Sequence, residues 1–351
     1  MRRALTPEEA DMYKRILLAT DGSPTAETAE RIGVALARTT KAKLTVVYAY
    51  EDAARAQATV ERALAIAEAE GVKADAVLSA DDPSSAVLEA AEDKNADLIV
   101  LGSRGLYQGE QVFGSVVRKI AAHAPCDVLL TRAREVQLTP EEAPYRRLLI
   151  ATDGSATADR AARKGFGLAK RLEAAVALVF VGHPKTGELV LQDTVVTMGE
   201  EEGIEAVTTI RQGDAAQEII AEAREWSADL VVIGNRGLAG TKAILVGSVP
   251  LTVAEYAATD VLIARTIAQS LEEIGKGEGG IVTSGDHKVA VFRDRKGNVH
   301  TLSAKCTHMG CTVKWNTTDK TWDCPCHGSR FGPAGEVVNG PAAKPLPATD
   351  L

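Results

Sequence analysis

Aromatic residues make up only 4% of this chain of 351 residues, so any buried core must be built mainly from aliphatic side chains. Basic residues are outnumbered by acidic ones, and the net charge of −8 argues against general nucleic-acid binding, which needs a basic surface. No apolar run approaches the ~20 residues of a membrane span. No apolar export segment follows Arg2-Arg3. We therefore expect a cytoplasmic protein that binds neither nucleic acid nor membrane.

Cysteine is almost absent until the last part of the chain. Cys126 is isolated, whereas Cys306, Cys311, Cys324 and Cys326 lie close together near the C-terminus. Such crowding indicates a local metal or disulfide site rather than the framework of a secreted domain. The remaining composition, 45% hydrophobic and 25% charged, is that of a globular protein.

Two regions of the chain are nearly copies of each other. Residues 15–23 (RILLATDGS) recur at 147–155 (RLLIATDGS), and residues 96–105 (ADLIVLGSRG) recur at 228–237 (ADLVVIGNRG), both with an offset of 132 residues. This self-similarity predicts a tandem duplication, followed by a region of different texture. We place three domains at residues 1–137, 138–268 and 269–351.

Each copy alternates short continuous apolar runs with amphipathic stretches of helical period. Apolar runs of this kind are typical of strands buried on both faces, and intervening helices imply a parallel sheet. We therefore predict two doubly wound α/β domains, each with a five-stranded parallel sheet and four helices. The expected strands are 15–20, 43–50, 74–79, 97–102 and 127–131 in the first copy, and 147–152, 174–182, 205–210, 229–234 and 260–264 in the second.

The residues that follow the first and fourth strands of each copy are candidates for a ligand site, because such sheets bind ligands beyond the carboxyl ends of their strands. Asp21 and Asp153 follow the first strands, where helix capping is the simpler explanation. After the fourth strand of the second copy comes Gly234-x-x-Gly237, then nine residues, then Gly247-Ser248. Glycines here let backbone N–H groups approach a phosphate at a helix N-terminus.

Each copy resembles a universal stress protein domain. In ATP-binding members of that family, G-x2-G-x9-G-S/T follows strand four and an Asp ends strand one. The resemblance implies that the second copy binds ATP or ADP and that Val181 lines the adenine pocket. The first copy departs from the pattern, because only eight residues separate Gly105 from Gly114. The first-copy candidates are Asp21, Gly102, Gly105, Gly114 and Ser115, and those of the second copy are Asp153, Val181, Gly234, Gly237, Gly247 and Ser248.

Two stress domains commonly pair in this family, and here the pair can form within one chain; a homo-oligomer is left open. Neither copy contains a P-loop lysine motif or a dinucleotide fingerprint. We therefore expect nucleotide binding or regulation rather than rapid hydrolysis.

The C-terminal region has the pattern of short strands separated by turns, and we expect strands at 281–283, 288–293, 299–303, 312–315 and 321–324. This pattern predicts a small all-β domain, in which a metal site or cross-link would add stability. At its centre are C-x-H (Cys306, His308) and C-x-x-H (Cys324, His327). Two Cys and two His could hold tetrahedral Zn²⁺, but they also suit a [2Fe-2S] cluster with both thiolates on one iron and both imidazoles on the other.

The region resembles a Rieske [2Fe-2S] domain well beyond these four residues, including Trp315, Trp322 and the segment 339–342. The resemblance implies that Cys306, His308, Cys324 and His327 are the cluster ligands. It also implies a disulfide between Cys311 and Cys326, and that Gly340-Pro341-Ala342 covers the cluster.

Histidine ligation leaves the oxidised cluster neutral instead of doubly negative, which raises its reduction potential within a general range of roughly −150 to +300 mV. By the same resemblance, Ser329 donates a hydrogen bond to a bridging sulfide, whereas Phe331 replaces a tyrosine that donates to a cysteine ligand. We therefore expect a potential below the top of that range.

The predictions for the stress domains and for the Rieske domain together indicate one function. We expect a Rieske-type electron-transfer or redox-responsive protein on a nucleotide-binding tandem stress domain, with a redox partner protein, rather than a stand-alone enzyme. The alternative is an ATP-binding stress regulator in which the cluster is only a sensor or a structural element.

Overall fold

The computed structural model divides into two compact units, Met1–Arg265 and Thr266–Leu351, which are considered separately. The residues described are 12–49, 53–103, 114–136, 138–139, 141–235, 247–265, 271, 274–284, 287–310, 312–316, 319–324 and 328–350. Within these ranges, no helix is long and apolar enough to cross a membrane.

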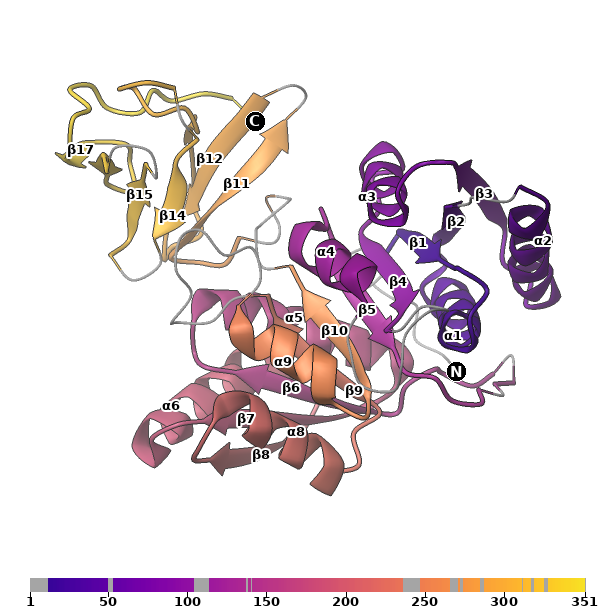
Figure 1. The fold of residues 1–351 in the computed structure, drawn as a ribbon. Helices are drawn as coiled ribbons and strands as arrows, with labels where there is room; N and C mark the ends of the chain where they lie inside the picture. Colours follow the sequence, from indigo (N-terminus) through magenta and orange to yellow (C-terminus); the bar gives the residue numbers. More distant parts are fainter. Residues whose placement is uncertain are drawn as a thin grey trace. The chain divides into compact units, whose positions relative to one another are not determined.

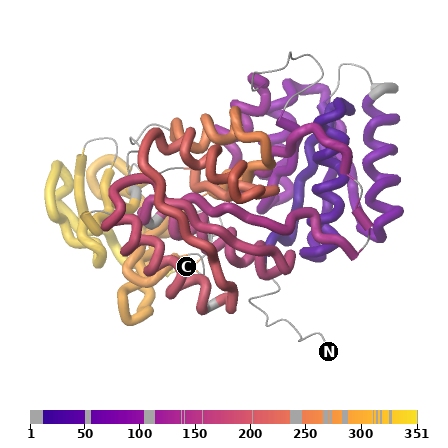
Figure 2. Tube along the Cα trace, turned by 90° about the horizontal axis from the view of Figure 1, so that it is seen from below, coloured from indigo at the N-terminus to yellow at the C-terminus, as the bar shows by residue number. Residues whose placement is uncertain are grey.

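The first unit is built on one ten-stranded sheet with the order β3-β2-β1-β4-β5-β10-β9-β6-β7-β8. Strands pair in parallel within each half, and β5 and β10 join the halves in antiparallel fashion. Figure 2 shows the two halves, indigo to purple and magenta to orange, lying side by side. The bounds are β1 Arg15–Ala19, β2 Lys43–Ala49, β3 Ala74–Ser79, β4 Leu98–Gly102, β5 Asp127–Thr131, β6 Arg147–Thr152, β7 Ala175–Val181, β8 Ala206–Arg211, β9 Leu230–Gly234 and β10 Asp260–Ala264.

Each half therefore has the predicted doubly wound fold, and the expected pairing of the two copies occurs within the chain. Adjacent strand residues point to opposite faces. Leu17, for example, belongs to one core with Val87 and Val117, whereas Leu18 belongs to the other with Ile32 and Val60. Continuous apolar strands are needed because both faces are covered. The arrangement can be followed in Figure 1.

The helices cover the two faces of this sheet. Their starts are encoded locally: Ser23 and Ser155, for example, accept the third backbone N–H of α1 and α5, from Ala26 and Ala158. The bounds are α1 Pro24–Thr40, α2 Ala53–Ala69, α3 Pro83–Asp93, α4 Ser115–His123, α5 Ala156–Leu172, α6 Pro184–Thr194, the π-helical turn η1 Val195–Gly199, α7 Glu200–Glu202, α8 Ala215–Glu225 and α9 Ser248–Tyr256.

A buried carboxylate anchors each side of the seam between the two halves. Asp260, fully buried at the start of β10, accepts hydrogen bonds from Tyr145 Oη at 2.8 Å and the backbone N–H of Arg132 at 2.8 Å. Arg134 of the first copy completes this site with a bond of 2.8 Å to the same carboxylate. The contacts of Arg132 and Arg134 with Asp260 cross from one copy to the other, so the halves form one unit rather than two tethered domains.

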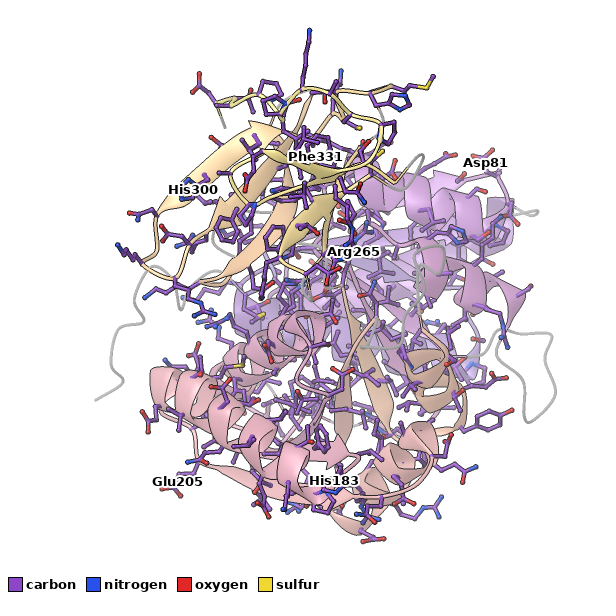
Figure 3. The ribbon with its side chains drawn as sticks, turned by 90° about the vertical axis from the view of Figure 1, so that its left-hand side faces the viewer. Asp81, His183, Glu205, Arg265, His300 and Phe331 are labelled. Atoms are coloured by element: carbon purple, nitrogen blue, oxygen red, sulfur yellow. The ribbon has the colours of Figure 1, made fainter. Side chains whose placement is uncertain are left out.

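The related carboxylate of the first copy is Asp127, at the start of β5. It accepts hydrogen bonds from Tyr13 Oη at 2.9 Å, Lys164 Nζ at 2.7 Å and the backbone N–H of Arg265 at 2.7 Å. Lys164 and Arg265 belong to the second copy, and Arg265 is labelled in Figure 3. The seam is thus crossed in both directions by charged side chains.

The second unit contains two antiparallel sheets, β11-β12-β13 and β14-β15-β16-β17. The bounds are β11 Glu278–Ser284, β12 His287–Arg293, β13 Val299–Ser303, β14 Lys314–Asn316, β15 Thr321–Asp323, β16 Arg330–Phe331 and β17 Val337–Asn339. The all-β prediction is confirmed. β16 and β17 were not predicted from the sequence.

One compact core links the two sheets of this unit. It contains Trp322 and Phe331, both fully buried, together with the predicted ligands Cys306 and Cys324. Phe331 is labelled in Figure 3. Both cysteines are part of this packed core, which holds them in position.

Candidate functional site

The two cysteines occupy corresponding positions in two loops of similar construction. Cys306 comes shortly after β13, and its carbonyl accepts the N–H of Gly310 at 2.8 Å. Cys324 directly follows β15, and its carbonyl accepts the N–H of Gly328 at 3.1 Å. Both glycines have a positive φ, of 72° and 75°, a conformation that side chains disfavour. In each case the cysteine carbonyl is therefore bonded to a glycine four residues later in the chain.

The environment of Cys306 favours the thiolate form. Burial by itself raises the pKa of its thiol. Hydrogen bonds to the sulfur from the backbone N–H of His308, the Cys324 thiol and the Ser329 hydroxyl outweigh burial, so the pKa lies below its ordinary value. A thiolate is the form that binds metal ions. Cys306 and Cys324 also belong to the same buried core, which places both cysteines at one site.

The other predicted ligands are described only in part. His308 is exposed, beside Met309, whose side chain is 67% exposed. His327, Cys311 and Cys326 lie outside the described residues, so the fourth ligand and the disulfide stay predictions. Over the described ranges, no group of three His, Cys, Asp or Glu side chains forms a metal-binding cluster.

The segment predicted to cover the cluster packs against the second loop. The backbone N–H of Ala342 donates to Ser329 Oγ at 3.1 Å. A Cβ atom at Gly340, which has a φ of 100°, would lie 2.5 Å from Ser329 Cα, so only glycine fits this approach. A further contact, which the sequence analysis missed, runs from Thr307 Oγ1 to the carbonyl of Lys344 at 2.6 Å. The covering segment is thereby attached to both loops.

In the first unit, the candidate aspartates have a structural role. Asp21 Oδ1 accepts the N–H of Ser23 at 2.9 Å, and Asp153 Oδ1 accepts the N–H of Ser155 at 3.0 Å. Both carboxylates therefore stabilise the turn that leads into a helix, as the capping interpretation expects.

The first and last glycines of each predicted loop motif lie at the end of a strand and at the start of a helix. Gly102 and Gly234 are the last residues of β4 and β9, and Gly114 and Gly247 precede α4 and α9 without a side-chain cap. Uncapped N–H groups at a helix start suit an anion.

In the second copy, the start of α9 is joined to the residue after β9 by a hydrogen bond. The N–H of Gly247 donates to the carbonyl of Asn235 at 2.7 Å. Gly105 and Gly237 lie outside the described residues. Val181, half-buried, ends β7, and Ser115 and Ser248 begin α4 and α9.

Comparison with known families accounts for both units. The model of the universal stress protein family matches residues 12–132, 144–202 and 185–265, and the model of the Rieske [2Fe-2S] domain matches residues 265–350. Among solved structures, a universal stress protein from Archaeoglobus fulgidus DSM 4304 has a TM-score of 0.59 at 22% identity, over 72% of this chain and 98% of that one. That likeness concerns the fold.

The curated relatives match the C-terminal unit. YhfW of Bacillus subtilis (strain 168), named as a Rieske 2Fe-2S iron-sulfur protein, is 55% identical over 80 residues, which are 23% of this chain and 16% of that protein. The cytochrome b6-f complex iron-sulfur subunit of Synechococcus sp. (strain JA-2-3B'a(2-13)) is 34% identical over 113 residues, 32% of this chain and 57% of that subunit. The chain therefore belongs to the universal stress protein family, and its two stress-protein copies are followed by a C-terminal Rieske [2Fe-2S] domain.

Proposed function

We propose that this protein is a one-electron carrier or redox-responsive protein, with a Rieske-type cluster attached to a nucleotide-binding tandem stress domain. The observation that carries the proposal is the pair of buried cysteines, Cys306 and Cys324, at matching positions of two glycine-turned loops. A pKa lowered by hydrogen bonds makes Cys306 a ready metal ligand. These donors fit an iron-sulfur site better than a zinc finger, where C-x-H would be an unusual spacing.

The residues of the domain have separate parts in this proposal. Cys306 and Cys324 would bind one iron through sulfur, and His308 and His327 the other through nitrogen. When bound, the cluster takes up and releases one electron. Trp322 and Phe331 are fully buried and limit solvent around the sulfur ligands.

The exposed side of the site suits contact with another protein. His308 and Met309 are both exposed at the tip of the first loop, next to the buried Cys306. An imidazole ligand at the surface gives electrons a short route to and from a redox partner. We therefore assign the first loop as the place where the partner binds.

A redox titration followed by electron paramagnetic resonance tests this function. We expect red-brown protein with two irons and two sulfides per chain, and a midpoint potential below the upper end, near +300 mV, of the general Rieske range. Phe331 is the reason, because its ring has no hydroxyl to donate to a cysteine ligand. Colourless protein with one zinc per chain contradicts the carrier function, and a midpoint at the upper end contradicts our reading of Phe331.

A second candidate function is that of an ATP-binding stress regulator in which the cluster is only a sensor or structural element. It is favoured by the second copy, whose glycine loop has the full nine-residue spacing. The same titration with and without ATP distinguishes the candidates. A midpoint that changes with ATP supports redox sensing linked to nucleotide, whereas a constant midpoint leaves the two units to act separately.

Nucleotide binding by the second copy is tested with a matched pair of variants. Asp153→Ala and Asp21→Ala remove the same turn hydrogen bond, of 3.0 and 2.9 Å, so both should lower stability similarly, by about 1 kcal/mol. We expect calorimetry to show that Asp153→Ala weakens ATP binding at least about tenfold while Asp21→Ala leaves it unchanged. Equal effects of the two variants, or no binding by the unmodified protein, would contradict a nucleotide site in the second copy.

A further inference from the structure

The indole nitrogen of Trp322 has no hydrogen-bond partner among the described residues of the Rieske domain. The side chain is fully buried, and Nε1 makes no hydrogen bond with any atom of the part of the chain that the structure describes. Buried donors are nearly always satisfied, because a donor without an acceptor loses its bond to water and gains nothing in return. An indole N–H is a donor only. An acceptor that does not belong to the polypeptide is therefore to be expected beside Trp322.

The neighbouring Trp315 is packed in the same aromatic group, yet its indole nitrogen has a hydrogen-bond partner. Aromatic packing therefore does not by itself explain why Trp322 Nε1 lacks an acceptor. Trp315 lies 4.9 Å from Trp322 between ring centroids, in an edge-to-face arrangement. Its own Nε1 donates to Glu278 Oε2 at 3.0 Å. Of these two adjacent indoles, one has a carboxylate acceptor and the other has none.

The strand register places Trp322 on the same side as the sulfur ligands. Alternate residues of a strand share a face, so Trp322 lies on the face of Cys324, two residues later. The opposite face holds Thr321 and Asp323, whose side chains bond each other at 2.8 Å.

Two further contacts tie the indole to the ligand side. Trp322 pairs across the sheet with Phe331 of β16, and both pack in one core with Cys306 and Cys324. This core contains the sulfur atoms of the predicted cluster site, those of Cys306 and Cys324.

We propose that Trp322 Nε1–H donates a hydrogen bond to a bridging sulfide of the [2Fe-2S] cluster. This inference rests on the proposed function. One-electron reduction adds negative charge to these sulfur atoms, and a donor pointed at them stabilises the reduced form more than the oxidised form. The proton stays on the indole nitrogen throughout. Trp322 thereby raises the reduction potential and in part offsets the hydroxyl that Phe331 lacks.

The test compares Trp322→Phe with Trp315→Phe in the full-length, cluster-loaded protein. Each variant removes one indole N–H and keeps an aromatic ring, but only the first removes the proposed bond to sulfur. We expect Trp322→Phe to lower the one-electron reduction equilibrium constant about tenfold, which is a midpoint shift of about 59 mV. Trp315→Phe should change it less than twofold.

A spectroscopic measurement on the unmodified protein makes the inference testable even if Trp322→Phe loses its cluster. With ¹⁵N-indole tryptophan, electron-nuclear double resonance of the reduced cluster should show one strongly coupled indole N–H whose proton exchanges in deuterated water. The absence of that coupling, or equal midpoint shifts in the two variants, would overturn the assignment and indicate a buried water as the acceptor. If the unmodified protein gives no Rieske spectrum at all, the proposed function fails instead.

Discussion

Cys306→Ala and Cys324→Ala are each expected to yield a protein with no [2Fe-2S] cluster, because each removes one of two sulfur ligands of the same iron. The remaining cysteine would supply only one of the two sulfur ligands that this iron needs. Iron analysis, visible absorbance and electron paramagnetic resonance should all show complete loss. The first unit should keep its folding transition, since it has its own cores.

Cys126→Ala is the matched control for these variants. Cys126 is also buried, at 4% exposure, and burial raises the pKa of its thiol, so it is held as a neutral side chain. Its replacement should leave two irons per chain. Iron retained by Cys306→Ala, or lost from Cys126→Ala, would contradict the ligand assignment.

Asp260→Ala is expected to lower the free energy of unfolding of the first unit by about 3–5 kcal/mol, the usual cost of removing one partner of a buried ion pair. The carboxylate is fully buried and holds Tyr145, Arg134 and the backbone of Arg132. The substitution leaves a buried phenol and a half-buried guanidinium without their acceptor. Chemical denaturation of the full chain measures the loss.

An exposed acidic residue of the same unit is the control for Asp260. Glu27 forms an exposed pair with Arg31 at 3.7 Å, one helical turn away. Glu27→Ala should therefore change the free energy of unfolding by less than about 1 kcal/mol. If Asp260→Ala costs no more than Glu27→Ala, the seam between the copies does not depend on its buried charges.

The strands of the first unit could be predicted because each of them is a continuous apolar run in the sequence. All ten lie within one or two residues of the expected ranges. The sequence also indicated that the copies pair, but not through which strands. The β5–β10 contact depends on matching residues such as Leu129 and Leu262, far apart in the chain, and no local pattern specifies that register.

The Rieske domain was less predictable in its details. Its ligand residues could be recognised from their unusual spacing in the sequence alone. The contact between Ala342 and Ser329 and the unsatisfied donor of Trp322 depend on how loops and sheets pack, and no spacing encodes them. A buried tryptophan looks the same in the sequence whether or not its N–H has a partner, as Trp315 and Trp322 illustrate.

Mössbauer spectroscopy of the ⁵⁷Fe-enriched protein tests the central claim most directly, because it reports on each iron separately. Two cysteine sulfurs on one iron and two histidine nitrogens on the other must give two different ferric sites in equal amounts. We expect two quadrupole doublets of equal area in the oxidised protein, with the extra electron localised on one iron after reduction. Two indistinguishable ferric sites, or the absence of iron, would contradict this account.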